Sequence, residues 1–380
     1  MPDQDISTLC VHGARDTHNT TGAVAVPIYQ SATFAHPGVG ESTGYDYSRS
    51  QNPTREALER TVALLEGGTD AMAFSTGMAA MTVLFELFAP GDHIVASGDL
   101  YGGSVRLLDH VVRKNGVSVE YANTADPTAV ERLINAHTKA VFVETPTNPM
   151  MQVTDISAIS RIAKANGLLL IVDNTFLTPY LQRPLLLGAD VVLHSGTKYL
   201  GGHNDTLAGF LVVENAGLGE KLRFLYKTIG ACLSPFDSFL IHRGLKTLAI
   251  RMERIQENAF QIAQWLCEQE KVKTVHYAGL PAHPGYAVSC KQASGFGGMI
   301  SFEVDCVETA KRVLNGVQTI LYAESLGGVE TLITYPILQT HADVPIEVRE
   351  ALGINDRLLR LSVGIEAVSD LIADLRAVLQ

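Results

Sequence analysis

A lysine in a glycine-rich loop is the residue whose surroundings first suggest chemistry. Lys198 follows the apolar run DVVLH within the segment HSGTKYLGGHND, and upstream the run LLLIVD ends at Asp173. Ligands of open α/β sheets bind at the carboxyl ends of the strands, so both side chains are expected at that edge. A buried carboxylate needs a partner, and a protonated pyridinium nitrogen would supply one. Taken alone, Lys198 would be interpreted as a solvated loop residue.

A third segment offers a site for phosphate. The run AFSTGMAAM places Ser75, Thr76 and Gly77 between a strand and the start of a helix. Free backbone amides and the helix dipole favour an anion at such a position. An amine, a carboxylate for a ring nitrogen and a phosphate site together match pyridoxal 5'-phosphate (PLP), whose protonated ring acts as an electron sink. The plainer interpretation of STGM alone is close packing at a helix start.

Other cofactors and partners fit poorly. The chain lacks GxxxxGK[ST], HExxH and a GxGxxG after a strand, and its five cysteines form no CxxC pair, so no metal is expected. The net charge of −11 argues against nucleic acid and anionic membranes. No apolar run reaches the roughly 18 residues that span a bilayer, and the first residues do not resemble a signal peptide. We therefore expect small-molecule substrates and a cytoplasmic location.

The order of the predicted elements indicates how these residues are positioned. Residues 1–50 are rich in Gly, Ser, Thr and Pro but carry aromatic residues, which predicts an extended arm that packs on another surface. Helical patterns and short apolar runs then alternate over 51–240, as in a doubly wound, mostly parallel sheet. A long helix-compatible stretch follows Pro235. Strand-like and helical runs then predict a smaller α/β domain over 241–380.

Eight segments in order carry a resemblance to a known family. They are YSRSQNPTR, FSTGMAAM, DLYGG, VETPTNP, VDNTF, HSGTKYLGGHND, ESLGGVETL and RLSVGIE. Together they resemble the Cys/Met-metabolism PLP enzymes, or cystathionine γ-synthase-like family, over nearly the whole chain. The resemblance implies a PLP-dependent transferase of fold-type I. It also implies a homotetramer, a dimer of dimers whose active sites are shared between subunits.

The resemblance also implies roles for individual residues. Lys198 would form the Schiff base with PLP and move protons, Asp173 would pair with the pyridinium nitrogen, and Tyr101 would stack on the ring. The phosphate would be held by Gly77, Met78, Ser195 and Thr197, and by Tyr47 and Arg49 of the neighbouring subunit. Arg360 would hold the α-carboxylate of the substrate, and Asn148 would help position either that carboxylate or the ring hydroxyl. Ser325 would hydrogen-bond the lysine.

Specificity is expected to depend on a few charged residues. Glu324 matches an acidic position of family members that handle cystathionine, where it could face the distal amino group. Asp46 could add to this, and Arg106 is a candidate for a distal carboxylate or an acyl group. Each could equally be a surface charge. Gly103 stands where methionine γ-lyases tend to carry cysteine, which argues against that branch.

The family divides one set of intermediates among γ-replacement, γ-elimination and β-elimination. The segments GESTGYDYSRS, LSPFDSFL and YPILQTHADVP resemble bacterial cystathionine γ-synthases and O-acetylhomoserine thiol-lyases. The first hypothesis is therefore γ-replacement, in which cysteine displaces the acyl group of an O-acylhomoserine to give L-cystathionine. The alternative is cystathionine γ-lyase, which releases cysteine, 2-oxobutanoate and ammonia. A non-catalytic PLP-binding protein is the least favoured interpretation.

Overall fold

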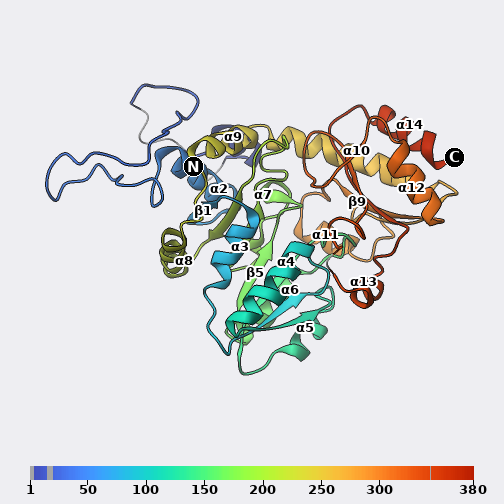
Figure 1. The fold of residues 1–380 in the computed structure, drawn as a ribbon, viewed down its shortest axis with the longest axis horizontal. Coiled ribbons are helices and arrows are strands. Elements are labelled where there is room, and N and C mark those ends of the chain that lie inside the picture. The colour runs from blue at the N-terminus through green and yellow to red at the C-terminus, as the bar shows by residue number, and fades with distance from the viewer. Residues whose placement is uncertain (1–3, 15–19, 343) are drawn as a thin grey trace.

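Two sheets lie side by side in the protein, and the N-terminal segment extends away from them (Figure 1). The structure, a computed structural model, describes residues 4–14, 20–342 and 344–380. A helix, α1 (Ile6–His12), precedes the extended segment and buries Leu9 and Cys10. The expectation of an extended arm over all of 1–50 is therefore wrong for α1, because two apolar side chains of that helix reach the core.

The larger sheet has seven strands in the order β1-β7-β6-β5-β4-β2-β3. Five of them, from β6 to β3, run parallel, whereas β7 is antiparallel to both of its neighbours. Their bounds are β1 (Asp70–Phe74), β2 (His93–Ser97), β3 (Ser118–Ala122), β4 (Thr138–Glu144), β5 (Leu169–Asp173), β6 (Val191–Ser195) and β7 (Gly209–Val213). The sheet is thus mostly parallel, as the sequence predicts.

Helices cover both faces of this sheet. Ala71 and Ala73 pack into one apolar cluster with α2 (Pro53–Glu66) and α6 (Ile156–Ala165). Met72 and Phe74 point the other way, into a second cluster with α3 (Gly77–Phe85) and α8 (Ala216–Ile229). Burial on both faces explains why the strands carry continuous apolar runs. Shorter helices complete this part: α4 (Gly102–Leu107), α5 (Pro127–Leu133) and α7 (Thr178–Leu181).

The stretch after Ser234 forms two helices. The first, α9 (Pro235–Leu245), is capped by the Ser234 hydroxyl, which accepts from the amide of Asp237 at 3.0 Å. The second, α10 (Leu248–Cys267), runs from the larger sheet toward the smaller one (Figure 1). The sequence predicts one long helix here, and the structure differs by a break at residues 246–247. Apolar positions on both sides of the break are buried, so periodicity alone does not reveal it.

The smaller sheet has five strands in the order β10-β11-β12-β9-β8. Its strands are β8 (Val272–His276), β9 (Met299–Val304), β10 (Leu321–Tyr322), β11 (Leu332–Thr334) and β12 (Leu358–Ser362). An apolar cluster joins the sheet to α10, α12 (Val307–Gly316) and α14 (Val368–Leu379). Two further helices, α11 (Tyr286–Gln292) and α13 (Ile346–Leu352), lie at its periphery, and α13 buries none of its residues.

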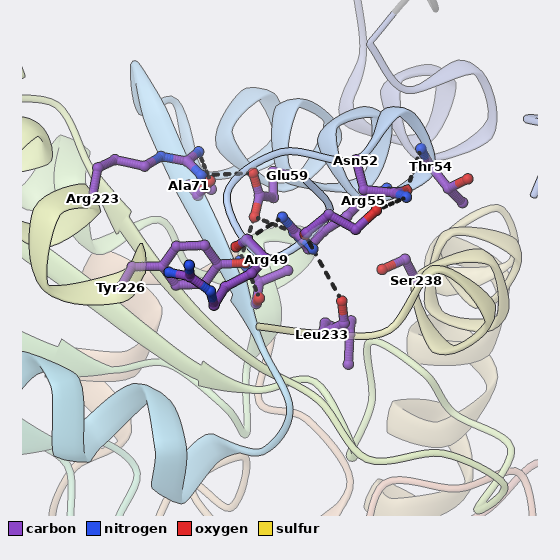
Figure 2. Close-up of polar contacts among 12 residues, drawn as sticks. Arg49, Asn52, Thr54, Arg55, Glu59, Ala71, Arg223, Tyr226, Leu233 and Ser238 are labelled. Carbon is purple, nitrogen blue, oxygen red and sulfur yellow. Dashed lines mark hydrogen bonds and ion pairs between the residues drawn. The ribbon is translucent and has the colours of Figure 1, made fainter. Parts of the chain in front are cut away.

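A network of charged side chains fastens α2 to β1 and α8 (Figure 2). Glu59, which is buried, accepts from Arg223 at 2.8 Å and from the backbone amide of Ala73 at 2.9 Å. Arg223 also donates to Asp70 at 2.6 Å, and Arg55 lies 3.5 Å from Glu59. Because each buried charge has an opposite charge beside it, the burial penalty is offset. The network fixes β1, whose end leads into the start of α3.

Within the described residues, no helix is long and apolar enough to cross a membrane. The same part of the chain contains no cluster of His, Cys, Asp or Glu side chains that could hold a metal ion.

Candidate active site

One cavity of about 350 Å³ opens at the carboxyl ends of β4, β5 and β6. This is the edge at which α/β sheets bind ligands. The walls come from both parts of the molecule, since residues near β10 and β12 of the smaller sheet also line it. Its lining includes these residues singled out from the sequence: Gly77, Met78, Tyr101, Asn148, Asp173, Ser195, Thr197, Lys198, Glu324, Ser325 and Arg360.

Lys198 lies in the loop after β6, and its amine points to the smaller domain. Its Nζ donates to the hydroxyl of Ser325 at 2.8 Å. Burial and, to a smaller extent, the charge of Arg360 lower the pKa of Lys198 to about 8, and the charge of Glu324 opposes this decrease. The amine is therefore neutral in a substantial fraction of molecules near pH 8, which a nucleophile or a general base requires.

Asp173 ends β5 and is nine-tenths buried at 9% exposure. Its Oδ1 accepts from the backbone amide of Thr175 at 2.9 Å and from the Thr175 hydroxyl at 2.6 Å. The Thr175 Oγ1 in turn accepts from the amide of Ser195 at 2.9 Å. This contact orients the Thr175 hydroxyl so that its hydrogen points to Asp173. Burial raises the pKa of Asp173, and the Thr175 hydrogen bonds oppose that rise. A cation next to Asp173 would favour its charged form.

The start of α3 forms a cradle beside the end of β6. Thr76 caps the helix, and its hydroxyl accepts from the amide of Ala79 at 2.9 Å. A Cβ at Gly77 would lie 3.1 Å from the Cβ of Ser195, so the absence of a side chain allows this close approach. The amides of Gly77 and Met78 begin the helix, where intrahelical acceptors are missing. Ser195 and Thr197 also line the cavity.

Arg360 lies in the middle of β12 with only 1% of its surface exposed. Its guanidinium donates to Asn148 Oδ1 at 2.9 Å, to the backbone oxygen of Ser325 at 2.9 Å and to Thr334 Oγ1 at 3.1 Å. None of these partners is charged. A buried guanidinium held only by neutral groups suits a carboxylate ligand, because a charge-assisted pair would compensate its burial.

Four of the predicted site residues do not line this cavity within one chain: Asp46, Tyr47, Arg49 and Arg106. Asp46 accepts from Ser42 at 2.9 Å within the N-terminal segment. Arg49 stacks over the ring of Tyr47 and donates to the backbone oxygen of Lys227 in α8 at 2.5 Å. Tyr47 and Arg49 are thus fixed on the outside of their own chain. Arg106 is exposed on α4.

Two residues of the site were missed from the sequence. Glu144 ends β4 and stands opposite Asp173 in the register of the two strands. Thr175 holds Asp173, as described above. The signal for Glu144 was an acidic residue directly after the apolar run AVFV, the same pattern that identified Asp173. The signal for Thr175 was a hydroxyl two residues after that carboxylate, a spacing at which backbone and side chain can both donate to it.

The residues present fit PLP. Both donations from Thr175 go to Oδ1 of Asp173, and within the described part of the chain no donor contacts Oδ2. That oxygen is available to a cationic ring nitrogen. The cradle at Gly77 supplies amides for a phosphate, and Lys198 supplies a primary amine with a lowered pKa. The doubly wound sheet, the second domain and this cavity together have the features of an α/β enzyme with a PLP site, in which Lys198 would be the lysine that binds the cofactor.

Comparison with known proteins agrees with this class. The family model for Cys/Met metabolism PLP-dependent enzymes matches residues 7–380, and the chain belongs to this family. It is 48% identical to a cystathionine beta-lyase of Lactococcus lactis subsp. cremoris over 99% of both chains. It is 49% identical to a cystathionine gamma-synthase/O-acetylhomoserine (thiol)-lyase of Bacillus subtilis, over 99% of this chain and 96% of the relative.

A solved structure extends the likeness to three dimensions. The cystathionine gamma-lyase of Lactobacillus plantarum, complexed with L-serine, superimposes with a TM-score of 0.97 at 44% identity, covering 99% of this chain and 98% of that one. The predicted fold class, the PLP cofactor and an enzyme of sulfur amino-acid metabolism are therefore confirmed. The relatives catalyse different trans-sulfuration reactions, so the family alone does not define the specific activity.

Proposed function

We propose that the protein catalyses γ-replacement, in which cysteine displaces the acyl group of an O-acylhomoserine and L-cystathionine forms. The observation that carries the proposal is that two residues of opposite charge, Arg360 and Glu324, line the cavity together with Lys198 and both act on its amine. Arg360 suits the α-carboxylate of an amino acid, and Glu324 suits the distal amino group of cystathionine. The γ-synthase-like segments of the sequence favour the synthetic direction.

The residues of the site would divide the work. When bound, PLP draws electrons from the substrate Cα, which makes the Cα and Cβ protons acidic. Lys198 accepts and returns these protons as its neutral amine, and Ser325 holds Nζ in place. The Cγ–O bond then breaks with loss of the acyl group as a carboxylate, and the cysteine thiolate forms the Cγ–S bond. Asp173, held by Thr175, keeps its charge toward the ring nitrogen.

Two contributions from a second copy belong to this proposal. Tyr47 and Arg49 are exposed on the N-terminal segment, side by side, and do not line their own cavity. We assign them to the phosphate site of a neighbouring subunit, within a homotetramer of two dimers. Asp46 and Arg106 would then act at the distal end of the substrate. The cytoplasmic location stays a prediction from the sequence.

A cystathionine lyase is the second candidate, because relatives that are 48% identical carry lyase names. Elimination needs the same Lys198 chemistry but no incoming thiol. γ-Elimination of cystathionine gives cysteine, 2-oxobutanoate and ammonia, whereas β-elimination gives homocysteine, pyruvate and ammonia. The products therefore distinguish the three reactions.

One assay separates the candidates. The purified protein is given O-acetyl- or O-succinylhomoserine with cysteine, and separately cystathionine alone, and cystathionine, 2-oxobutanoate and pyruvate are quantified. The proposal predicts cystathionine formation with a kcat/KM well above that of either elimination. Rapid release of 2-oxobutanoate or pyruvate from cystathionine, without any synthesis of cystathionine, would refute it.

A further inference from the structure

The backbone of Tyr101 is held by a buried acid. Tyr101 precedes α4, and its side chain makes no capping hydrogen bond to that helix. Its backbone amide donates to Oε2 of Glu144 at 3.0 Å. Glu144 is only 6% exposed and belongs to a different element, the end of β4. The position of the exposed Tyr101 ring at the cavity is therefore coupled to the buried side chain of Glu144 at the end of β4.

Glu144 is placed where a carboxyl group is costly. It stands opposite Asp173 on the neighbouring strand and lines the same cavity. Burial and the charge of Asp173 raise the pKa of Glu144 well above its usual range, while the backbone amides of Tyr101 and Asn148 favour its charged form. A glutamate at this position would destabilise the protein unless its contacts offset the cost, because burial removes its hydration and the neighbouring Asp173 repels its charge.

The residues that precede Tyr101 are held by partners other than Glu144, so the contact of Glu144 is specific to Tyr101. Asp99 accepts from the amide of Met150 at 3.2 Å. The backbone oxygen of Leu100 faces Nε2 of His341 at 3.2 Å. Within the described residues, the hydrogen bond to Glu144 is the one made by the amide of Tyr101 itself. The segment thus has separate fixing points, and the one at the aromatic residue is Glu144.

We propose that Glu144 is a positioning residue that sets the height of the Tyr101 ring against the cofactor through the Tyr101 backbone amide. The inference rests on the proposed placement of Tyr101 on the cofactor ring. The length of the Glu144 side chain, which places an acceptor oxygen at the Tyr101 amide, is its essential property. The charge of Glu144 is secondary. An electrostatic role through Asp173 would instead depend on the charge and tolerate a shorter side chain.

Two variants separate reach from charge. Glu144→Gln keeps an acceptor oxygen at the same length without the charge. Glu144→Asp keeps the charge but withdraws the oxygen by one methylene group. A matched control is Glu120→Gln, on β3 of the same sheet, where the glutamate side chain is 55% exposed. The readouts on the holoenzyme are visible circular dichroism of the bound cofactor, which reports its asymmetric surroundings, cofactor affinity, and kcat and KM. Far-ultraviolet circular dichroism and Tm check folding.

We expect Glu144→Asp to change the visible dichroism and to lower kcat/KM by roughly tenfold, the effect of one lost buried hydrogen bond. Glu144→Gln should stay much closer to the wild type, and Glu120→Gln should match it. A Glu144→Gln variant that is as impaired as Glu144→Asp, or more so, would overturn the proposal in favour of an electrostatic role. If neither variant is affected, the proposal is also overturned, because Glu144 then has no role in positioning Tyr101. If Glu144→Asp fails to fold, the proposal depends on Glu144→Gln retaining the wild-type dichroism. If the Tyr101→Ala holoenzyme has the same visible dichroism as the wild type, the placement of the Tyr101 ring on the cofactor is refuted instead.

Discussion

The amine of Lys198 and the hydroxyl of Ser325 lie 2.8 Å apart in the lining of the cavity, and their hydrogen bond connects the two domains. Ser325 has a φ of 85°, in the left-handed region that residues other than glycine rarely adopt. The chain therefore bears a local cost, of about 1 kcal/mol, at the residue that orients the lysine. This combination of strain and contact is typical of a functional position.

Substitution of Ser325 should separate the strain from the contact. Ser325→Gly relieves the unfavourable φ and removes the hydroxyl, whereas Ser325→Ala removes the hydroxyl alone. We expect both variants to lower kcat by about tenfold, the effect of one hydrogen bond to a reacting amine. Ser325→Gly should also melt at a higher temperature than Ser325→Ala. Equal melting temperatures, or a normal kcat in either variant, would contradict this interpretation of Ser325.

The pKa of Lys198 predicts a pH profile for the protein stripped of cofactor. Burial lowers this pKa from 10.5 to about 8, so the neutral amine accumulates as the pH rises through about 8. Acylation of the Lys198 peptide, followed by mass spectrometry, should show a midpoint there. Because Glu324 raises the pKa, Glu324→Gln should move the midpoint to lower pH. A midpoint near that of an ordinary lysine, or an upward shift in the variant, would contradict the account.

Arg360 should control substrate affinity without controlling cofactor content. Its guanidinium donates to three neutral partners, and a lysine cannot replace such a fork. We expect Arg360→Lys to lower kcat/KM by roughly 10- to 100-fold, mainly through KM, since charged hydrogen bonds are worth about 1.5–3 kcal/mol each. The absorbance of the bound cofactor should change little. A variant with normal KM would exclude Arg360 from carboxylate binding.

His341 predicts a pH dependence of stability. Burial, helped by the charge of Arg360, lowers the pKa of His341 from 6.5 to about 4 in the folded state. As the pH falls from about 6.5 to 4, the unfolded chain takes up this proton first, so the folded state loses about 3 kcal/mol. His341→Gln lacks this loss. The free energy of unfolding of the wild type minus that of the variant should therefore decrease across this window.

Urea unfolding at several pH values measures that difference directly. Asp99, whose pKa is raised to about 6 by burial, titrates in the same window with the opposite sign, but it is present in both proteins and cancels. A difference that stays constant between pH 7 and pH 4.5 would show that His341 is not buried in its neutral form.

The residues expected to bind the cofactor could be proposed from the sequence because polar side chains directly follow its apolar runs. Asp173 and Lys198 both follow buried strands, and the edge where parallel strands end is fixed by topology. Glu144 follows the same rule and was missed, since an acid after a strand is common and nothing in the sequence shows that β4 and β5 are neighbours.

Other features depend on contacts that no local pattern encodes. The run GFLVV is visibly a strand, but its antiparallel position between β6 and β1 is set by packing. The contact of Arg360 with Asn148 joins residues 212 positions apart in the sequence. The roles proposed for Tyr47 and Arg49 would need a second copy of the chain, which a single sequence suggests only through its family.

The attachment of the cofactor to Lys198 is the central claim and can be measured directly. The holoenzyme is reduced with borohydride, digested, and mapped by mass spectrometry. The account predicts loss of the visible cofactor absorbance and a reduced pyridoxyl group on the peptide that contains Lys198, with no label in Lys198→Ala. A label on another lysine, or no labelled peptide from a protein supplied with PLP, would contradict it.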